Sequence, residues 1–569
     1  MAVTSAPKTK RPWLKFYDQG VPHTLTYPDV TLQTFLDRSA SEHPDVTATI
    51  FFNATLNYRE LSDLADRFAA GLQSLGVKKG DRVALVLPNS PQYVIAFYGA
   101  LRAGAIVVPT NPLYTPREMA HQFNATEADV VVVLSRMYPV VKAIAPQTPL
   151  VRHVVVTNIK EYMPALLRTL FTLAREKKDG HRADTAGDDR VRLFTDLLKV
   201  AAKPAAVPSA TTDVAALLAT GGTTGTPKFA ILSQRALVAN ALQCRAWFPG
   251  SEPGLVTLAF MPFFHSYGLT VLMNQAIAGA YTMVLIPQFN LEDMLKAIQK
   301  HRPQHFPGAP RVYVALNNSP LTKKYDLRSI RACMSGSAPL PLEVATTFEK
   351  LTHGGKIVEG YGLTEAGPVT HANPINGYCK IGTVGIPFPD VDAKIVDLDT
   401  GTREVAMGER GELLVRGPNL MDGYWQRPDE TDLTLKDGWL VTGDVATMDE
   451  DGYFTIVERK KEMIIVSGFN VYPREVEEVL YSHPAVMEAA AIGIPDTQRG
   501  EVVKVFVVLK PGQTASAEEL IAHCRGQLTG YKVPHQVEFR SELPKSLIGK
   551  ILRRQLADED KAKRQQAQS

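Results

Sequence analysis

The first part of the chain alternates between helical and strand-like patterns of apolar residues. The stretches "YRELSDLADRFAAGLQSLG" (58–76) and "QYVIAFYGALRAG" (92–104) repeat apolar positions at helical spacing and end at a glycine. Short apolar runs typical of buried strands lie between and after them: "DRVALVLP" (81–88), "AIVVP" (105–109) and "ADVVVVLS" (128–135). This alternation predicts an α/β fold built on mostly parallel sheets.

The pattern changes at about residue 380. Between 380 and 460, short strands are interrupted by Gly, Pro and Asp, which indicates a small β-rich subdomain. The segment "ERKKEMIIVSGFNVYPREVEEVL" (458–480) is a basic, turn-bounded joint, and an α+β pattern follows it. A chain of 569 residues is too long for one core. We therefore predict a large N-terminal domain (1–460) that contains the β-rich subdomain, and a small C-terminal domain (461–569).

Composition narrows the class of protein. The net charge of +3 is small for this length, so bulk charge does not indicate a nucleic-acid-binding protein. The four cysteines are far apart and form no C-x-x-C pair, which argues against a disulfide scaffold or a zinc site. The N-terminus lacks the apolar stretch of a signal peptide. We expect a cytoplasmic protein.

The segment 253–291 contains no Asp, Glu, Lys or Arg and has room for a membrane span of about 20 residues. Pro262, His265, Gly268 and other prolines, glycines and polar residues interrupt it at short intervals. A strand, a loop, a buried helix and a second strand describe it better. We expect an interior segment that walls an apolar pocket.

The segment "IKEYMPALLRTLFTLAREKKDGHR" (159–182) combines leucines with arginines and lysines on one predicted helix. A basic amphipathic helix of this type can lie in a membrane interface. It can also be an ordinary surface helix that packs on the core, and the sequence leaves both interpretations open.

The stretch "LATGGTTGTPKFAI" (218–231) places glycines and threonines beside a single lysine. Backbone amides of a Gly-rich turn can form a cradle for an anion, so a phosphate chain is one candidate ligand. The stretch is not a Walker loop, because Pro227 precedes Lys228 and Phe229 follows it. Taken alone, it can equally be a flexible surface turn.

Five further motifs occur in a fixed order along the chain. They are "SGSAPLP" (335–341), "EGYGLTEAG" (359–367), "GWLVTGD" (438–444), "VERKKEMIIVSGFNVYP" (457–473) and "LPKSLIGKILRR" (543–554). Together they resemble the adenylate-forming superfamily of acyl-CoA synthetases, luciferases and peptide-synthetase adenylation domains, over nearly the whole chain. "GAIVVPTNPLYTPREM" and "GPVTHANPINGYCKIGTVGIPFPD" look most like bacterial long-chain fatty-acid CoA ligases.

The resemblance implies ATP-dependent activation of a medium- to long-chain fatty acid. The carboxylate would attack the α-phosphate of ATP to give acyl-AMP and pyrophosphate, and the thiol of coenzyme A (CoA) would then expel AMP. Mg²⁺ with ATP is the implied cofactor, and ATP, fatty acid and CoA are the implied partners, with no nucleic acid. Two alternatives stay open: adenylation of another carboxylate, such as an aryl acid, or transfer to a carrier protein, and a non-catalytic fatty-acid-binding protein at the membrane. Peripheral association with the inner face of the membrane and a homodimer are also left open.

The resemblance also implies roles for individual residues around ATP. The loop that would hold the β- and γ-phosphates consists of Thr220, Gly221, Gly222, Thr223, Thr224, Gly225, Thr226 and Lys228. Within it, Thr223 is a candidate ligand of Mg²⁺, and Phe229 follows where the family commonly has glycine. Backbone at Gly336, Ser337 and Ala338 would line the adenine, and the family often has glycine at position 337.

The "YGLTE" motif supplies further implied contacts. Tyr361 would stack on adenine beside Gly362, Thr364 would contact the α-phosphate, and Glu365 would bind Mg²⁺. The residues implied in catalysis are Lys550, Glu365, Lys228 and Thr364.

By the same resemblance, Asp444 would accept both ribose hydroxyls, with Arg459 in support. The C-terminal domain would be mobile and rotate about Lys461, bringing Lys550 to the α-phosphate in the first step. The CoA channel of the second step would be lined by Ser467, Gly468 and Phe469. The acyl pocket would be lined by His265, Tyr267 and Leu269, and Leu269 stands where some long-chain relatives have a tryptophan gate.

Overall fold

The computed structural model describes residues 11–200, 203–220, 227–496, 498–546 and 550–568 of the chain. The chain forms two compact units. The larger contains Trp13–Asp392 and Arg416–Leu440, and the smaller contains Ala393–Val415 and Val441–Ser569. The boundary predicted at Lys461 lies within the smaller unit and remains a prediction, as does the β-rich subdomain at 380–460.

The centre of the larger unit is an eight-stranded sheet. Its strands are, in spatial order, β18 (Gly423–Tyr424), β9 (Lys228–Ser233), β8 (Val214–Thr220), β4 (Ile106–Pro109), β3 (Arg82–Val86), β5 (Val130–Leu134), β6 (His153–Thr157) and β7 (Val191–Leu193). The strands from β8 to β7 are parallel, whereas β9 and β18 run antiparallel to their neighbours. All five residues of β5 are buried, as expected for a strand covered on both faces. The prediction of a mostly parallel sheet is confirmed.

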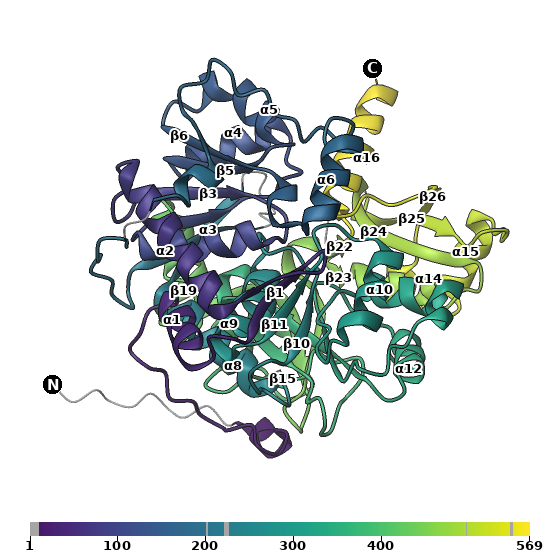
Figure 1. Cartoon of the computed structure of the whole chain (residues 1–569). Helices are drawn as coiled ribbons and strands as arrows, with labels where there is room; N and C mark the ends of the chain where they lie inside the picture. Colours follow the sequence, from purple (N-terminus) through teal and green to yellow (C-terminus); the bar gives the residue numbers. More distant parts are fainter. Residues whose placement is uncertain (1–10, 201–202, 221–226, 497, 547–549, 569) are drawn as a thin grey trace. The chain divides into compact units, whose positions relative to one another are not determined.

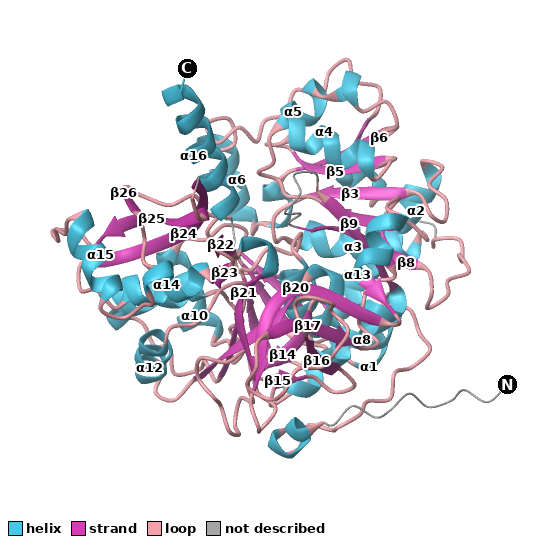
Figure 2. Ribbon diagram, turned by 180° about the vertical axis from the view of Figure 1, so that it is seen from behind, coloured by secondary structure: helices cyan, strands magenta, loops and turns pink. Residues whose placement is uncertain are grey.

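Helices cover both faces of this sheet, as Figures 1 and 2 show: α2 (Tyr58–Ser74) and α3 (Pro91–Arg102) lie on one face, and α4 (Pro116–Ala125) and α5 (Tyr138–Ala143) on the other. Their ends follow local rules. The Asn57 side chain and Glu60 form a capping box at the start of α2. The α3 helix begins with a proline after the Ser90 cap.

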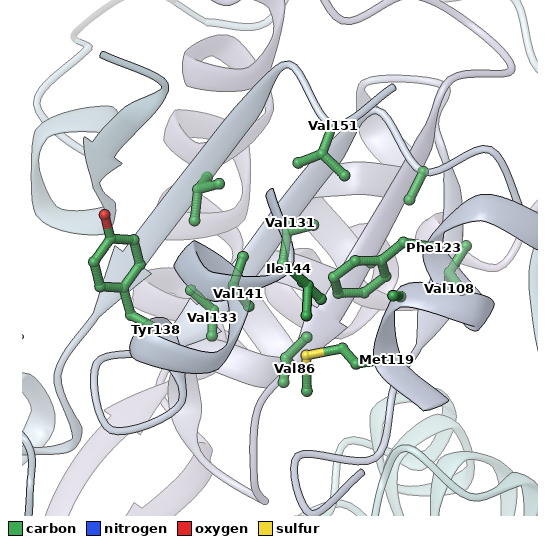
Figure 3. Packing of buried hydrophobic residues seen from close by; sticks show 14 of the residues in the cluster. Val86, Val108, Met119, Phe123, Val131, Val133, Tyr138, Val141, Ile144 and Val151 are labelled. Carbon is green, nitrogen blue, oxygen red and sulfur yellow. The ribbon is translucent and has the colours of Figure 1, made fainter. Parts of the chain in front are cut away.

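The core between α4, α5 and the sheet is built from branched aliphatic and aromatic side chains. Figure 3 shows Phe123 of α4 and Val141 of α5 packed near Val131 and Val133 of β5. These side chains are almost fully buried, and burial of this apolar area stabilises the layer.

Two four-stranded sheets complete the larger unit. One contains β10 (Val256–Ala259), β11 (Thr282–Leu285), β1 (Thr47–Phe51) and β2 (Ala54–Asn57); the other contains β12 (Ala332–Ser335), β13 (Lys356–Gly362), β14 (Val369–Ala372) and β15 (Ile386–Pro387). The longer helices around them are α1 (Gln33–Glu42), α8 (Gln234–Trp247), α10 (Leu291–His301), α11 (Pro310–Asn318) and α12 (Leu342–Leu351). His305 pairs with both Thr257 and Ala332, which joins the two sheets at their edges.

The charge-free segment 253–291 folds as predicted. Along the chain, a buried π-helix, η4 (Gly268–Asn274), and the short helix α9 (Gln275–Gly279) lie between the strands β10 and β11. Among the described residues, no helix has the length and apolar character needed to cross a membrane.

The smaller unit has the predicted α+β character. One sheet has the order β16 (Asp392–Val396), β17 (Gly411–Arg416) and β20 (Trp439–Met448), and β21 (Phe454–Arg459) also pairs with β20. A second sheet contains β23 (Phe469–Val471), β22 (Ile464–Val466), β25 (Gly500–Leu509), β24 (Val486–Asp496) and β26 (Gln536–Phe539). The helices α14 (Pro473–Tyr481) and α15 (Ala517–Arg525) share one core with this sheet, and α16 (Arg553–Gln568) contributes to another.

Candidate active site

The predicted phosphate loop connects two antiparallel strands. Thr220 ends β8 and lies opposite Lys228, the first residue of β9. The six predicted loop residues between them, Gly221, Gly222, Thr223, Thr224, Gly225 and Thr226, lie outside the described residues. The pairing of β8 with β9 thus fixes the positions of Thr220 and Lys228 in the larger unit.

Lys228 is the centre of a charged cluster. Its ammonium forms an ion pair with Glu430 and lies 4.7 Å from the centre of the Tyr424 ring. The Tyr424 hydroxyl donates a 2.8 Å hydrogen bond to Oε1 of Glu365. The structure therefore brings together Lys228 and Glu365, which the sequence singled out, with two residues that it did not. The only sequence feature that could have found Tyr424 and Glu430 is the aromatic and acidic content of "DGYWQRPDET" (422–431).

The turn after β12 has a strained backbone. Ser337 adopts φ +72°, a left-handed conformation that favours glycine. Next to it, a Cβ added to Gly336 would lie 3.5 Å from Cζ of Tyr267, in ordinary contact. The Tyr267 hydroxyl donates to the Met334 carbonyl at 2.6 Å, so this ring is fixed beside the turn that leads to Ala338.

The "YGLTE" motif runs from the end of β13 into a short 3₁₀ helix, Thr364–Ala366. Tyr361 lies opposite His371 of β14, and their ring centres are 5.8 Å apart. A Cβ added to Gly362 would lie 2.0 Å from the Pro368 carbonyl oxygen, so only glycine fits there. The Thr364 hydroxyl lies 3.3 Å from the Ser266 hydroxyl, next to His265. The motif thus meets the charge-free segment.

The residues predicted for the acyl pocket lie at the start of the π-helix. Burial lowers the pKa of His265 to about 4, so this side chain is neutral near pH 7 and suits a positioning role rather than general-base catalysis. Leu269 is fully buried, and Tyr267 is nearly so. A Cβ added to Gly268 would lie 2.2 Å from the Pro262 carbonyl oxygen, which explains the glycine. π-Helical turns are frequent at functional sites.

In the smaller unit, Asp444 and Arg459 lie opposite each other on β20 and β21. The Arg459 Nε is 3.1 Å from the Asp444 Oδ1. Burial lowers the pKa of the Lys550 ammonium, with a further lowering from Arg459, whereas Glu462 and Asp444 raise it. The charges of Asp444 and Arg459 therefore act on Lys550, so three residues predicted from separate motifs influence one another within this unit.

The predicted hinge and CoA-channel residues follow in the same unit. Lys461 lies in a short 3₁₀ helix, Lys460–Glu462, and its side chain is exposed. Ser467 and Gly468 form the turn between β22 and β23, with φ +50° and +83°. Phe469 is exposed and stacks on Tyr531, with ring centres 4.8 Å apart.

The residues present fit a Mg²⁺ ion that is held jointly with a substrate. No group of three or more His, Cys, Asp or Glu side chains that could hold a metal exists among the described residues. Mg²⁺ commonly binds through one or two carboxylates together with substrate phosphates. Glu365 provides one such carboxylate, and its Oε1 is already oriented by Tyr424.

The fold of the chain is similar to that of solved structures. ATP-bound MatB from Rhodopseudomonas palustris is 30% identical, with a TM-score of 0.81 over 93% of this chain and 99% of that one. A fatty acyl CoA synthetase from Mycobacterium tuberculosis is 26% identical, with a TM-score of 0.72 over 94% of this chain and 99% of that one. The fold is that of an adenylate-forming enzyme, with a large N-terminal domain and a smaller C-terminal one.

The family follows from the sequence comparisons. The family model described as AMP-binding enzyme matches residues 36–425, and the AMP-binding enzyme C-terminal domain matches residues 475–550. The chain belongs to the AMP-binding enzyme family. It is 46% identical to a long-chain-fatty-acid–CoA ligase of Bacillus subtilis over 97% of this chain and 99% of the relative. It is 41% identical to the ligase of the same name from Escherichia coli O157:H7, with the same coverage.

Proposed function

We infer that this protein is a long-chain-fatty-acid–CoA ligase. It activates a medium- to long-chain fatty acid with ATP through an acyl-adenylate and transfers the acyl group to CoA, with release of AMP and pyrophosphate. The observation that carries this function is the 46% identity to the Bacillus subtilis ligase over 97% of the chain. The two alternatives have no comparable support: transfer to an acceptor other than CoA, and an aryl acid as the main substrate.

We assign the roles of the first step residue by residue. Lys228 and Thr364 contact the phosphates, and Asp444 with Arg459 holds the ribose. Lys550 stabilises the charge that develops when the carboxylate attacks the α-phosphate, which is an electrostatic role. The action of the Asp444 and Arg459 charges on Lys550 supports this assignment. Glu365 would hold Mg²⁺, which when bound would supply Lewis-acid stabilisation of phosphate charge.

The second step uses the turn that contains Ser467 and Gly468, which we assign to the CoA channel. Its exposure and its short, glycine-containing backbone support contact with a substrate. We further propose that the C-terminal domain rotates about Lys461 between the steps, a hinge motion of a known type.

We also propose that the enzyme associates with the inner face of the membrane through α6 (Ala165–Ala174). None of its residues is buried, and Leu166, Leu170 and Leu173 are 75%, 53% and 81% exposed. These three leucines share one face of the helix. Arg168, on the opposite face of the helix, and Lys177 and Lys178, just after its end, are also exposed, and their positive charges suit anionic lipid headgroups. A homodimer remains a prediction that light scattering would test.

The experiment that tests the function is a pyrophosphate-release assay with a panel of carboxylates, each with and without CoA. We expect saturated fatty acids in the medium to long range to be the best substrates, with acyl-CoA formed only when CoA is present. Faster turnover of acetate or of an aryl acid than of every fatty acid would reject the assignment.

A further inference from the structure

Lys228 is held by two side chains that come from a distant part of the chain. Its ammonium pairs with the Glu430 carboxylate, which belongs to α13 (Pro428–Thr434), and lies over the Tyr424 ring. The side chains of Lys228 and Glu430 are 16% and 32% exposed, so water and salt screen the pair less than a surface ion pair. The other carboxylate oxygen of Glu430 is 4.0 Å from Nε of Arg427. These contacts within the protein define the position of the ammonium.

The Tyr424 ring is itself fixed by backbone contacts. Tyr424 pairs with Ala230 of β9, two residues beyond Lys228, and its N–H donates to Oγ1 of Thr431 at 2.9 Å. Its hydroxyl donates to Glu365, and burial together with the Glu365 charge raises the Tyr424 pKa. One aromatic side chain thus connects the lysine of the phosphate loop with the carboxylate assigned to Mg²⁺.

We propose that Glu430 and Tyr424 are positioning residues of the ATP site, which hold the Lys228 ammonium ready for the phosphates and orient the Glu365 carboxylate. This inference rests on the proposed function, in which Lys228 contacts ATP. A free lysine side chain has many rotamers, and holding it in the bound geometry lowers the entropic cost of binding. An ammonium has three N–H donors, so the pair with Glu430 leaves donors for phosphate oxygens.

The test of Glu430 is the variant Glu430→Gln, which keeps the shape of the side chain and removes its charge. We expect the KM for ATP to rise about tenfold, the KM for the fatty acid to stay unchanged, and supplied acyl-AMP to react with CoA at the normal rate. The matched control is Asp429→Asn, the same charge change on the adjacent, exposed residue of α13, which should leave all three values unchanged. Melting temperatures verify that both variants fold.

The test of Tyr424 is the variant Tyr424→Phe, which keeps the ring over Lys228 and removes the hydroxyl bonded to Glu365. Calorimetric titration with ATP should give the wild-type affinity without Mg²⁺ and a smaller gain in affinity when Mg²⁺ is added.

An unchanged or lower KM for ATP in Glu430→Gln overturns the proposal for Glu430. An unchanged Mg²⁺ effect in Tyr424→Phe overturns it for Tyr424. If the wild-type enzyme binds ATP but releases no pyrophosphate with any fatty acid, the proposed function fails, and the calorimetric comparison still decides this inference.

Discussion

Arg553 forms a bidentate ion pair with Glu477, with Nε 2.9 Å and Nη2 2.7 Å from the two carboxylate oxygens. The same guanidinium lies 3.2 Å from Oε1 of Glu458 and also contacts Glu462. Glu458 belongs to β21 and Glu477 to α14, so one arginine connects segments before and after Lys461 within the smaller unit. Planar, bidentate geometry makes this the strong type of ion pair.

We predict that Arg553→Met lowers the free energy of unfolding by about 3–5 kcal/mol, because it leaves buried carboxylates without their partner. Urea denaturation followed by circular dichroism measures the change. The control is Arg554→Met at the next position. Arg554 lies 3.6 Å from Asp558, both side chains are largely exposed, and the change should cost less than about 1 kcal/mol. Equal losses in the two variants would contradict the role of Arg553.

Glu458 should make stability depend on pH. Burial, together with the charge of Glu477, raises its pKa from 4.5 to about 6 despite the opposing effect of Arg553. The folded protein therefore keeps a proton that the unfolded chain loses above pH 4.5. The stability from this group is fully present below pH 4.5 and is lost as the pH rises through about 6.

The measurement compares wild type with Glu458→Gln, in which this titration is absent. The unfolding free energy of wild type relative to the variant should fall by about 1–2 kcal/mol between pH 5 and pH 7. A constant difference across this range would show that Glu458 does not titrate as inferred.

Sequence patterns predicted the elements but not the partners of the charged residues. The apolar run of β5 and the segment 253–291 encode buried structure locally, because periodicity and punctuation by Gly and Pro depend only on neighbouring residues. Motifs likewise identified Lys228 and Glu365. Their contacts with Tyr424 and Glu430 depend on the pairing of β18 with β9, nearly two hundred positions apart in sequence, which no local pattern specifies.

Arg553 illustrates the same limit of local patterns. It lies three residues after Lys550 in "GKILRR", a basic stretch whose sequence does not indicate which of its charged side chains is buried. Only the packing of α14 and β21 around it makes it a buried ion-pair partner, whereas Arg554 beside it stays exposed. Identical residue types in adjacent positions can therefore have different roles.

Substitutions of Ser337 test whether the backbone of the turn after β12 is strained. The Ser337 φ of +72° costs about 1 kcal/mol for a residue with a Cβ. Ser337→Gly relieves this strain but gives the unfolded chain more freedom, so the melting temperature should change little or rise slightly. Ser337→Val should lower stability by about 1–3 kcal/mol, because a β-branched side chain is disfavoured at positive φ. Ser337→Asn, which tolerates this conformation, is the control and should behave as wild type.

The helix α6 should bind anionic membranes through its exposed leucines. We predict that the protein sediments with vesicles containing phosphatidylglycerol at low salt and is released as salt rises. Replacing Leu166, Leu170 and Leu173 by Ser should abolish this binding. Phe171→Ser is the contrasting variant, because Phe171 packs against His181 with ring centres 5.5 Å apart and should affect stability instead. Absence of vesicle binding in the wild-type protein would leave α6 as an ordinary surface helix.

Lys550 should act only in the first half of the reaction. In the smaller unit the charges of Asp444 and Arg459 act on it, and in the proposed function its ammonium meets the charge that develops at the α-phosphate. Such an interaction is strongest in the transition state. Lys550→Ala should therefore slow acyl-AMP formation by roughly two or more orders of magnitude, comparable to the loss of one preorganised donor. Supplied acyl-AMP should still react with CoA at close to the wild-type rate.

Two further variants serve as controls for the assignment of Lys550 to the first half-reaction. Lys545→Ala removes a lysine of the same segment that pairs with Glu488, and it should leave both half-reactions unchanged. Gly468→Ala should adenylate normally and slow thioester formation, because it adds a Cβ at φ +83° in the turn assigned to the CoA channel, where no neighbouring atom lies within 4 Å. Single-turnover assays of each half-reaction separate these effects. If Lys550→Ala slows both half-reactions equally in a folded protein, Lys550 does not act specifically in adenylation.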